Sequence, residues 1–415
     1  MPKEPEIVTF GCRLNTYESE IIQQNLNKEG IKDITVYNSC AVTEESVRQL
    51  KYSIRKKRKD DPNTKIVVTG CAAQIDPELF TDMYEVDKVI GNSEKRDISK
   101  HLFRNNNKLV SDIMTNDDPL NSLSSSFKSK TRAFVEIQNG CNHRCTFCVI
   151  PYGRGHLRSK SKEQIANEIK NLINCGHKEI ILTGVDIASW NKDHNNDTNL
   201  SSLIEYILNK VQNLERLRLS SMDVIGFDDR LIELFAHSNK LLPHIHLSIQ
   251  SGDNLILKRM KRRHSREDAI GLCNKLKSKR SDISFGADLI AGFPTETDEM
   301  FQNTISIIEE CQLDWIHAFP FSPRPGTPAA KMPQNDIKII KKRSKILREV
   351  AKKRKDNHIK KLVGKTIEVF VEKNNRGYSS QFAPVKLLGK KIESGQKVLA
   401  LIKMSDKDFA YGEII

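Results

Sequence analysis

Short apolar, β-branched runs alternate with longer amphipathic segments along most of the chain. In the first hundred residues, the expected strands are 7–10, 35–37, 65–69 and 88–90. The amphipathic segments at about 16–29 and 43–59 are expected to be helices. Strands that alternate with helices in this way indicate a parallel sheet covered by helices.

A second alternating series occupies the middle of the chain. Its expected strands are 133–138, 178–183, 215–220, 244–249, 284–290 and 314–319, each followed by a helical pattern. Six such units at fairly even spacing predict a full or partial (β/α) barrel. The chemistry of such a barrel lies at the carboxyl ends of its strands.

The remaining segments suggest how the chain is divided. Residues 115–130 are polar and Ser-rich, which is typical of a linker. A long basic helix is expected at about 335–361, followed by strands at 366–371 and 397–402. We therefore expect an α/β protein with an N-terminal sheet domain (1–114), a barrel with a trailing helix (131–361) and a small all-β module (362–415). Small β-barrels of this kind often bind single-stranded nucleic acid.

The charge of the chain points to a polyanionic partner. The 415 residues carry a formal net charge of +14, and 38% of them are hydrophobic, as in globular proteins. RNA or DNA is the first candidate partner, because a surplus of this size favours nucleic acid. Two basic runs are candidates for backbone contact, although a solvated helix face is the usual alternative. They are 55–59 and the set Lys341, Lys342, Arg343, Lys345, Arg348, Lys352, Lys353, Arg354 and Lys355.

The sequence predicts a cytoplasmic protein that does not enter a membrane. No apolar run reaches the roughly 18 residues that span a bilayer, and the first residues lack the apolar core of a signal peptide. Nine cysteines in a reducing compartment are unlikely to be disulfides, which turns attention to metal binding or catalysis.

Three cysteines form a tight cluster directly after the first expected barrel strand. Cys141, Cys145 and Cys148 have the spacing C-x-x-x-C-x-x-C. Three thiolates can bind three irons of a 4Fe-4S cluster and leave the fourth iron free to chelate S-adenosylmethionine. The alternative is a structural zinc site, in which His143 or His156 would complete the four ligands.

Three further cysteines follow the first three expected strands of the N-terminal sheet. They are Cys12, Cys40 and Cys71. Because the carboxyl ends of parallel strands line one crevice, we expect these thiols to form a second three-cysteine site. Gly11 and Gly70 would permit close backbone approach. A single cysteine there would be a buried core residue, and that interpretation is kept for the remaining three, Cys175, Cys273 and Cys311.

The motifs resemble those of a known enzyme family. The segment 141–148, with Pro151 and Arg154-Gly155, resembles radical S-adenosylmethionine (SAM) enzymes. Segments 9–15, 38–43 and 70–74 are similar to the methylthiotransferase subfamily, with further matches at 182–187, 246–252 and 321–328. Two features depart from the pattern: Thr295 stands where a glycine is often found, and the C-terminal module is short.

The resemblance implies three domains, the last of them a TRAM-like module for RNA, and two 4Fe-4S clusters. By position, Cys12, Cys40 and Cys71 would bind the auxiliary cluster, and Cys141, Cys145 and Cys148 the radical one. It further implies two SAM molecules per turnover, an electron donor such as flavodoxin or ferredoxin, a sulfur donor, and the tRNA anticodon stem-loop as substrate.

The residues after Cys12 resemble one branch of the subfamily. Their pattern Arg-Leu-Asn-x-Tyr-Glu-x-Glu is similar to the MtaB-type branch, whose members act on N6-threonylcarbamoyladenosine beside the anticodon. The isopentenyladenosine branch usually has Gln-Met-Asn at this place, and the branch that modifies a ribosomal-protein aspartate has Pro-Lys-Asn. The expected reaction replaces the hydrogen on adenine carbon 2 with SCH₃. Its alternatives are the reactions of the other two branches and a zinc-stabilised RNA-binding protein without catalysis.

Several residues at or near the expected strand ends are candidates for SAM binding, with barrel packing or loop capping as the alternative. They are Phe147, Arg154, Gly184, Asp186, Ser220, Gln250, Asp288 and Phe319. Arg154 and Arg158 follow the radical cluster motif and could pair with the carboxylate of the cofactor or with phosphate. The sequence assigns no residue to the chemical step itself.

Overall fold

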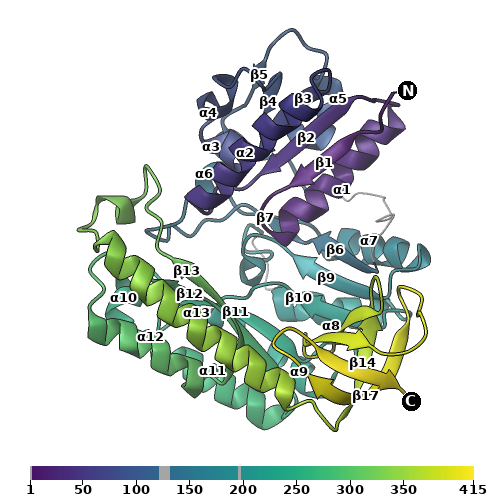
Figure 1. Ribbon diagram of the computed structural model, residues 1–415, viewed down its shortest axis with the longest axis vertical. Helices are drawn as coiled ribbons and strands as arrows, with labels where there is room; N and C mark the ends of the chain where they lie inside the picture. The colour runs from purple at the N-terminus through teal and green to yellow at the C-terminus, as the bar shows by residue number, and fades with distance from the viewer. Residues whose placement is uncertain (1, 121–130, 195–197) are drawn as a thin grey trace.

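The computed structural model describes residues 2–120, 131–194 and 198–415. Figure 1 shows an N-terminal sheet at the top, a larger α/β part below it, and a small β-barrel at the lower right. The expected α/β fold class is confirmed, and it includes the parallel sheets and the small C-terminal barrel. Most of the expected linker lies in 121–130, outside the described residues.

The N-terminal part is an all-parallel sheet in the order β1-β2-β3-β4-β5. Its strands are β1 (Glu6–Thr9), β2 (Ile34–Ser39), β3 (Lys65–Gly70), β4 (Lys88–Ile90) and β5 (Lys108–Leu109). Its helices are α1 (Arg13–Lys28), α2 (Glu44–Asp60), α3 (Cys71–Ile75), α4 (Glu78–Thr81) and α5 (Ile98–His101). The four strands expected from the sequence are present, whereas β5 has only two residues and gives no periodic signal.

Local sequence explains where these elements begin. The Thr43 hydroxyl caps α2 by accepting a hydrogen bond from the Ser46 N–H, and Glu44 and Glu45 follow in the first turn. Every residue of β2 is buried, as expected for an inner strand of a sheet that is covered on both faces.

The middle part is a partial barrel made of two parallel three-stranded sheets. One sheet has the order β10-β9-β6 and the other β11-β12-β13, and single bridges at Leu217–Leu241 and Met222–Leu247 connect them. The strands are β6 (Arg132–Glu136), β9 (Glu179–Thr183), β10 (Arg216–Leu219), β11 (His244–Gln250), β12 (Ser284–Ala291) and β13 (Leu313–Pro320). The hairpin β7 (Gln138–Asn139) and β8 (Arg158–Ser159) lies beside the cysteine loop. All six barrel strands expected from the sequence are therefore present.

Helices cover the outer face of the barrel. They are α7 (Lys162–Asn174), α8 (Leu200–Lys210), α9 (Asp229–His237), α11 (Arg266–Lys279), α12 (Asp298–Glu310) and α13 (Ile337–Lys360), with the short α6 (Ile150–Arg154) and α10 (Asn254–Arg259) near the cysteine loop. Phe285, Ala287 and Leu289 of β12 belong to the apolar core beneath these helices. Because strand side chains alternate, Gly286 and Asp288 face the opposite side, the barrel interior.

Helix α1 joins the first two parts. Leu14, Tyr17 and Ile21 belong to the barrel core, whereas Ile22 and Leu26 belong to the core of the N-terminal sheet. One helix therefore fixes the sheet against the barrel through two apolar faces.

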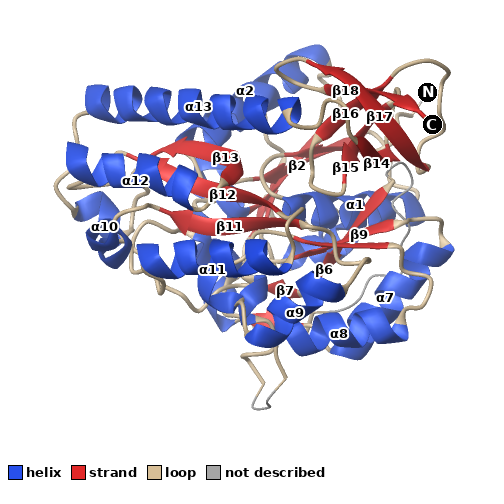
Figure 2. Ribbon diagram, turned by 90° about the horizontal axis from the view of Figure 1, so that it is seen from below, coloured by secondary structure: helices blue, strands red, loops and turns tan. Residues whose placement is uncertain are grey.

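The C-terminal part is a closed barrel in the order β14-β15-β16-β18-β17. Its strands are β14 (Thr366–Val371), β15 (Arg376–Ser379), β16 (Pro384–Leu387), β17 (Lys397–Ser405) and β18 (Ala410–Ile414). Figure 2 shows that helix α13 extends along β13 and reaches this module. Among the described residues, no helix has both the length and the apolar character needed to cross a membrane.

Candidate functional site

Topology brings the three N-terminal cysteines to one edge of the sheet. Thr9 of β1 lies opposite Asn38 of β2, and Ser39 lies opposite Gly70 of β3. Because the three strands end at the same level, the residues that follow them are neighbours. Cys12 is the N-cap of α1, Cys40 follows β2 directly, and Cys71 is the first residue of α3.

Two glycines allow this close approach, as expected. Gly11 has a φ of 100°, and a Cβ placed there would lie 2.9 Å from Cys40 Sγ. Gly70 has a φ of 94°, and a Cβ there would lie 2.4 Å from the backbone nitrogen of Ser39. Any side chain at these positions would combine backbone strain with a steric clash.

Polar groups surround the three sulfurs. The Val42 N–H points to Cys40 Sγ at 3.5 Å, and Asn92 Nδ2 lies 3.9 Å from Cys71 Sγ. Burial raises the pKa of Cys40 to about 11, an effect that the Val42 N–H partly opposes. A thiol with this pKa ionises near neutral pH only when a cation supplies compensating charge, which is the condition at a metal centre.

The second triad lies on one loop between β7 and α6, at the carboxyl end of β6. The Thr146 N–H donates to the Met260 carbonyl at 3.1 Å, and the Thr146 carbonyl accepts from the Ala329 N–H at 2.9 Å. These bonds fix the loop between α10 and the segment after β13. Burial raises the pKa of Cys141 to about 11 and that of Cys148 to about 12.

An arginine that the sequence analysis missed contacts this triad. Arg262 Nη1 lies 3.6 Å from Cys145 Sγ, while Nη2 donates to Asp223 Oδ2 at 3.0 Å and to the Ser248 carbonyl at 2.8 Å. The side chain is therefore held by two oxygens and directed at a sulfur. Its position within the Lys261–His264 basic run hid it, because such a run by itself indicates only a charged surface.

The spacing of the sulfurs separates the two metal interpretations. Among the described residues, the one group of three His, Cys, Asp or Glu ligand atoms within 4.8 Å of one another is His246, Asp288 and His317. Neither cysteine triad is gathered that tightly. A tetrahedral zinc with Zn–S bonds of about 2.3 Å would hold its sulfurs roughly 3.8 Å apart, whereas a 4Fe-4S cage binds each thiolate at a separate iron. Sulfurs farther apart than 4.8 Å are compatible with ligation of separate irons in a cluster and do not have the spacing of a preformed zinc site.

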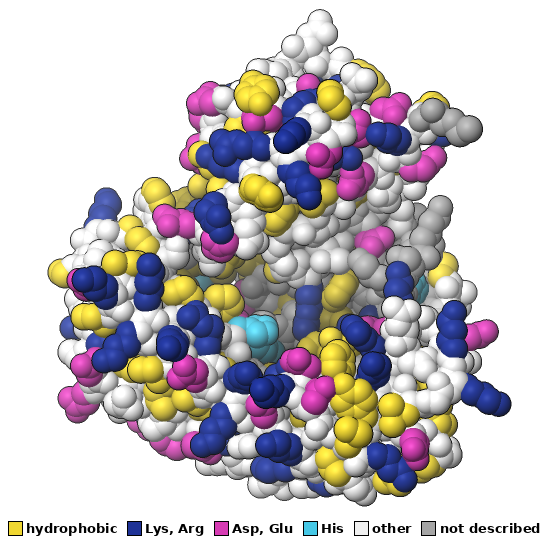
Figure 3. Space-filling view, in the orientation of Figure 1, with side chains coloured by type: hydrophobic (Ala, Val, Ile, Leu, Met, Phe, Trp, Pro, Cys, Tyr) yellow, Lys and Arg dark blue, Asp and Glu magenta, His cyan; other side chains and the backbone are white. Residues whose placement is uncertain are grey.

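Helices α3 and α6 connect the two triads. A Cβ on Gly153 of α6 would lie 3.3 Å from the Cβ of Cys71, so the helix after Cys148 packs against the helix that begins at Cys71. The structure thus brings the two cysteine sets to neighbouring positions between the N-terminal sheet and the barrel. Figure 3 shows the surface hollowed between these two parts.

Arg154 has a position different from the one expected of a SAM ligand. Its side chain is 3% exposed and donates to Glu18 at 2.8 and 3.0 Å and to Asn15 at 2.5 Å. Lys95 pairs with the same carboxylate at 2.6 Å, and the two cations lower the pKa of Glu18 to about 2 despite its burial. Through these contacts Arg154 links the end of α6 to α1. Because its guanidinium is buried and donates to these partners, we do not retain it as a cofactor ligand.

Arg158 and Cys175 also differ from expectation. Arg158 Nη1 donates to Asn116 Oδ1 at 2.9 Å and to the Asp118 carbonyl at 3.2 Å, so it fastens the segment after β5. Cys175 is exposed at the end of α7 and is not a core thiol, whereas Cys273 and Cys311 are buried as expected. A helix end gives no sequence signal for the burial of a cysteine.

Five of the other SAM candidates lie at or directly after the carboxyl ends of barrel strands, as expected: Gly184, Asp186, Ser220, Gln250 and Phe319. Asp288, which was also expected at a strand end, lies within β12, and Phe147 lies on the cysteine loop. Asp186 pairs with His143 of the cysteine loop at 3.0 Å and accepts from Ser189 at 2.6 Å. Asp288 accepts from His246 and His317 at 2.9 Å each. Gln250 has a φ of 74°, a strained backbone for a residue other than glycine.

The remaining candidates take part in packing. A Cβ on Gly184 would lie 2.6 Å from the Gln138 carbonyl, so this turn requires glycine. Ser220 is buried. Phe147 stacks edge-on against Phe293 at 6.4 Å, and Phe319 against His317 at 6.3 Å.

The two basic runs are only partly free for RNA. Arg58 donates to Asp87 and to three backbone carbonyls, and Lys57 pairs with Glu6. On α13, Arg343 is buried against Glu296, and Arg354 pairs with Glu309. The exposed members are Arg55, Lys56, Lys59, Lys341, Lys342, Lys345, Arg348, Lys352 and Lys353.

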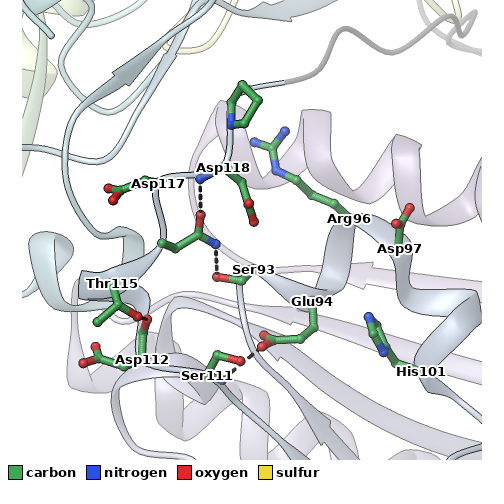
Figure 4. Close-up of a pocket in the computed structure, with 12 residues that line it drawn as sticks. Ser93, Glu94, Arg96, Asp97, His101, Ser111, Asp112, Thr115, Asp117 and Asp118 are labelled. Carbon is green, nitrogen blue, oxygen red and sulfur yellow. Dashed lines mark hydrogen bonds between the residues drawn. The ribbon is translucent and has the colours of Figure 1, made fainter.

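A pocket of about 610 Å³ between 93–101 and 111–119 has no cysteine among its lining residues. Figure 4 shows the carboxylates of Glu94, Asp97 and Asp112 around it, together with the Arg96 guanidinium and the His101 ring. An acidic lining disfavours RNA phosphate. The pocket is therefore not part of the candidate site.

Comparisons with known proteins agree with this arrangement. Residues 135–308 match the Radical SAM superfamily, and residues 5–91 match the uncharacterized protein family UPF0004. The chain is 14% identical to the radical SAM methyltransferase TsrM of Kitasatospora setae, with a TM-score of 0.56 over 77% of this chain and 75% of that chain. At this identity the likeness shows the fold alone.

Curated relatives cover nearly the whole chain. Threonylcarbamoyladenosine tRNA methylthiotransferase MtaB of Rickettsia prowazekii is 47% identical over 92% of this chain and 91% of its own length. MtaB of Aquifex aeolicus is 35% identical over 95% and 98%. A tRNA-2-methylthio-N(6)-dimethylallyladenosine synthase of Ehrlichia ruminantium is 34% identical over 89% and 87%. With two cysteine triads in place and a full-length match at this identity, the chain belongs to the MtaB family of radical SAM methylthiotransferases.

Proposed function

We propose that the protein is a tRNA methylthiotransferase that inserts SCH₃ at carbon 2 of N6-threonylcarbamoyladenosine, at tRNA position 37 beside the anticodon. The observation that carries the proposal is the pair of cysteine triads joined through α3 and α6. The names of the MtaB relatives give the modified base. The exposed lysines of α13 and the C-terminal barrel are suited to a polyanionic partner.

The reaction needs radical chemistry because the carbon 2 hydrogen of adenine is barely acidic, so that a side-chain base cannot remove it at a useful rate. Cys141, Cys145 and Cys148 would bind one 4Fe-4S cluster, and Cys12, Cys40 and Cys71 a second. When bound, the first cluster with SAM supplies a 5′-deoxyadenosyl radical and the second supplies sulfur, with one SAM used for methylation and one for the radical.

The protein's own residues would position these groups. Arg262 places a positive charge beside Cys145, and His143 ties the loop to Asp186 at the end of β9. Such contacts orient ligands and tune a cluster. The Arg154–Glu18–Lys95 network holds α1, and therefore Cys12, in fixed relation to α6. An electron donor such as flavodoxin or ferredoxin and a sulfur donor complete the proposed system, which would operate on tRNA in the cytoplasm.

Mass spectrometry of tRNA nucleosides from a strain that lacks the gene tests the proposal. We expect the methylthio form of threonylcarbamoyladenosine to disappear while threonylcarbamoyladenosine itself accumulates. Complementation with the intact gene should restore the product, and a gene with Cys12, Cys40 and Cys71 changed to alanine should not. Loss of a methylthiolated isopentenyladenosine instead would assign the protein to the other tRNA branch. Unchanged tRNA with a changed ribosomal-protein aspartate would reject a tRNA substrate.

A further inference from the structure

Arg13 is a cation without an acidic partner in the barrel interior. It follows Cys12 as the first residue of α1, and no ion pair or hydrogen bond involves its guanidinium within the described part of the chain. Its guanidinium lies 5.8 Å from the ring of Phe382, and the same ring faces Arg218 of β10 and Arg132 of β6. The guanidinium therefore extends from the N-terminal part toward the strands of the barrel.

The carboxylates within range of Arg13 are already engaged. Glu179 accepts from Arg216 at 2.8 Å and from Arg218 at 3.0 Å. Asp288 accepts from both His246 and His317 at 2.9 Å. Among the described residues, neither carboxylate forms an ion pair with Arg13.

The third cation of the group is also paired elsewhere. Arg132 forms an ion pair with Glu372 at 2.6 Å. The guanidinium groups of Arg13, Arg132 and Arg218 all lie within 5.8 Å of the Phe382 ring. A bound anion would offset the repulsion between these three cations.

An aromatic surface lies beside this cation. Phe382 stacks on His244 at 4.9 Å and on Tyr378 at 4.8 Å, and the guanidinium groups of Arg218 and Arg13 lie 5.0 and 5.8 Å from its ring. Phe382 has a φ of 70°, which a bulky residue adopts only when its surroundings hold it there.

The loop that carries Phe382 is anchored to the amino ends of the barrel strands. Ser284 Oγ and Trp315 Nε1 both donate to the Gln381 carbonyl, at 2.8 and 3.2 Å, and Arg218 donates to the Ser380 carbonyl at 3.3 Å. The N-terminal sheet domain, the barrel and the C-terminal module therefore all contribute side chains to one group of residues around the Phe382 ring, which we call the Phe382 compartment.

The position of Arg13 next to Cys12 fits the chemistry of the base. Consecutive Cα atoms are about 3.8 Å apart, so the first turn of α1 positions both the Cys12 thiol and the Arg13 side chain. Carbon 2 and carbon 6, which bears N6, both flank N1 on the Watson–Crick edge of adenine. A base that presents carbon 2 to the cysteines therefore keeps its N6 substituent close to the residues beside them, and a threonylcarbamoyl substituent ends in a carboxylate.

We infer that Arg13 binds the carboxylate of the threonylcarbamoyl group and so determines which N6-modified adenosine the enzyme accepts. Arg132 and Arg218 add to the positive potential, and the Phe382 ring forms one wall of the subsite. The inference rests on the proposed function, since it names the part of that substrate which the compartment recognises. An isopentenyl group carries no charge and would leave the guanidinium unpaired.

The test compares two anticodon stem-loop RNAs with the reconstituted, full-length protein under anaerobic conditions. One carries N6-threonylcarbamoyladenosine at position 37, and the other carries the same group with its carboxylate converted to the primary amide. The dissociation constant is measured by fluorescence anisotropy, and methylthiolation by mass spectrometry. We expect the acid to bind about 10- to 100-fold more tightly than the amide, the range of a charge-assisted hydrogen bond.

Two variants and one control assign this preference to Arg13. Arg13→Gln should remove it by weakening binding of the acid alone, and Arg13→Lys should keep part of it. The control Lys28→Gln removes one charge from the exposed last turn of the same helix and should keep the full preference. Equal affinity of the intact protein for acid and amide, or a preference that survives in Arg13→Gln, overturns the inference. Failure of the intact protein to methylthiolate the acid RNA rejects the proposed function instead, since the binding comparison is scored separately.

Discussion

The two cysteine triads are built in different ways. Cys141, Cys145 and Cys148 lie on one loop of eight residues, whereas Cys12, Cys40 and Cys71 follow three separate strands. The first arrangement depends on local loop geometry and needs few outside contacts. The second exists only when the whole parallel sheet has formed. A cluster bound by the second triad would therefore depend on the stability of the whole sheet, whereas a cluster bound by the first would depend on the contacts of one loop.

Removing each triad in turn tests this comparison most directly and has the largest expected effect. Changing Cys12, Cys40 and Cys71 to alanine should leave about four irons per chain in place of about eight, and should abolish methylthiolation while SAM is still cleaved to 5′-deoxyadenosine. Changing Cys141, Cys145 and Cys148 should abolish both reactions. Anaerobic iron and sulfide analysis with product chromatography measures these outcomes. Stoichiometric zinc in the intact protein would contradict the assignment.

Breaking the ion pair between Arg154 of α6 and Glu18 of α1 should remove a large part of the free energy of unfolding. Arg154→Met leaves the buried Glu18 carboxylate with Lys95 as its cationic partner, and we expect a loss of about 3–5 kcal/mol in anaerobic urea unfolding. The control Lys100→Met removes an exposed pair with Asp97 and should cost less than about 1 kcal/mol.

The pH dependence of the same variant sharpens this prediction. The folded-state pKa of Glu18, about 2, lies below its unfolded value of about 4.3. Its contribution to stability is therefore present above pH 4.3 and is lost as the pH falls toward 2. The difference between the intact protein and Arg154→Met should shrink on acidification through this range. A constant difference would show that Arg154 acts through packing instead.

For the triad of Cys141, Cys145 and Cys148, a substitution of Arg262 should have a smaller effect. Arg262→Gln should lower SAM cleavage about 10- to 100-fold and shift the reduction potential of the loop cluster, because its guanidinium contacts Cys145. The auxiliary cluster should keep its spectroscopic signature. Arg263→Gln is the matched control, since Arg263 contacts Asp223 at 3.0 Å and has no contact with a cysteine sulfur among the described residues. Equal effects of both variants would assign the role to Asp223.

The smallest effect is expected outside both triads. Reversing the charge of the exposed Lys341 and Lys345 on α13 should flatten the dependence of stem-loop RNA affinity on salt by about 1 to 2 in logarithmic slope. Reversing Lys170 and Lys210, which are exposed on α7 and α8, serves as the control. If both pairs change the slope equally, α13 has no special part in binding.

The limits of sequence reasoning follow from the same contrast. Strand periodicity predicted the parallel sheet and all six barrel strands, and the position of cysteines after strands predicted where the auxiliary triad lies. Short elements such as β5 and β7 were missed because two residues carry no periodicity. The part played by Arg154 could not be predicted either, because its partners Asn15 and Glu18 lie more than 130 residues earlier in the chain.

One departure from the family pattern became clearer with the structure. Thr295, at a position where glycine is often found, has a φ of 66°. Arg259 donates a hydrogen bond of 2.7 Å to its hydroxyl. The sequence marks the substitution, but only the backbone shows that it retains the left-handed conformation that glycine would adopt at little cost.

The hairpin between β15 and β16, which is anchored to the barrel, has a consequence for how substrate specificity can differ between related enzymes. A C-terminal module that only bound RNA could be exchanged between relatives without altering the barrel interior. Here the β15–β16 hairpin of the module contacts the barrel strands. A module taken from a relative would therefore need the same contacts from Ser284, Trp315 and Arg218 of the barrel. Changes in RNA specificity through the C-terminal module are therefore constrained by the residues of the barrel.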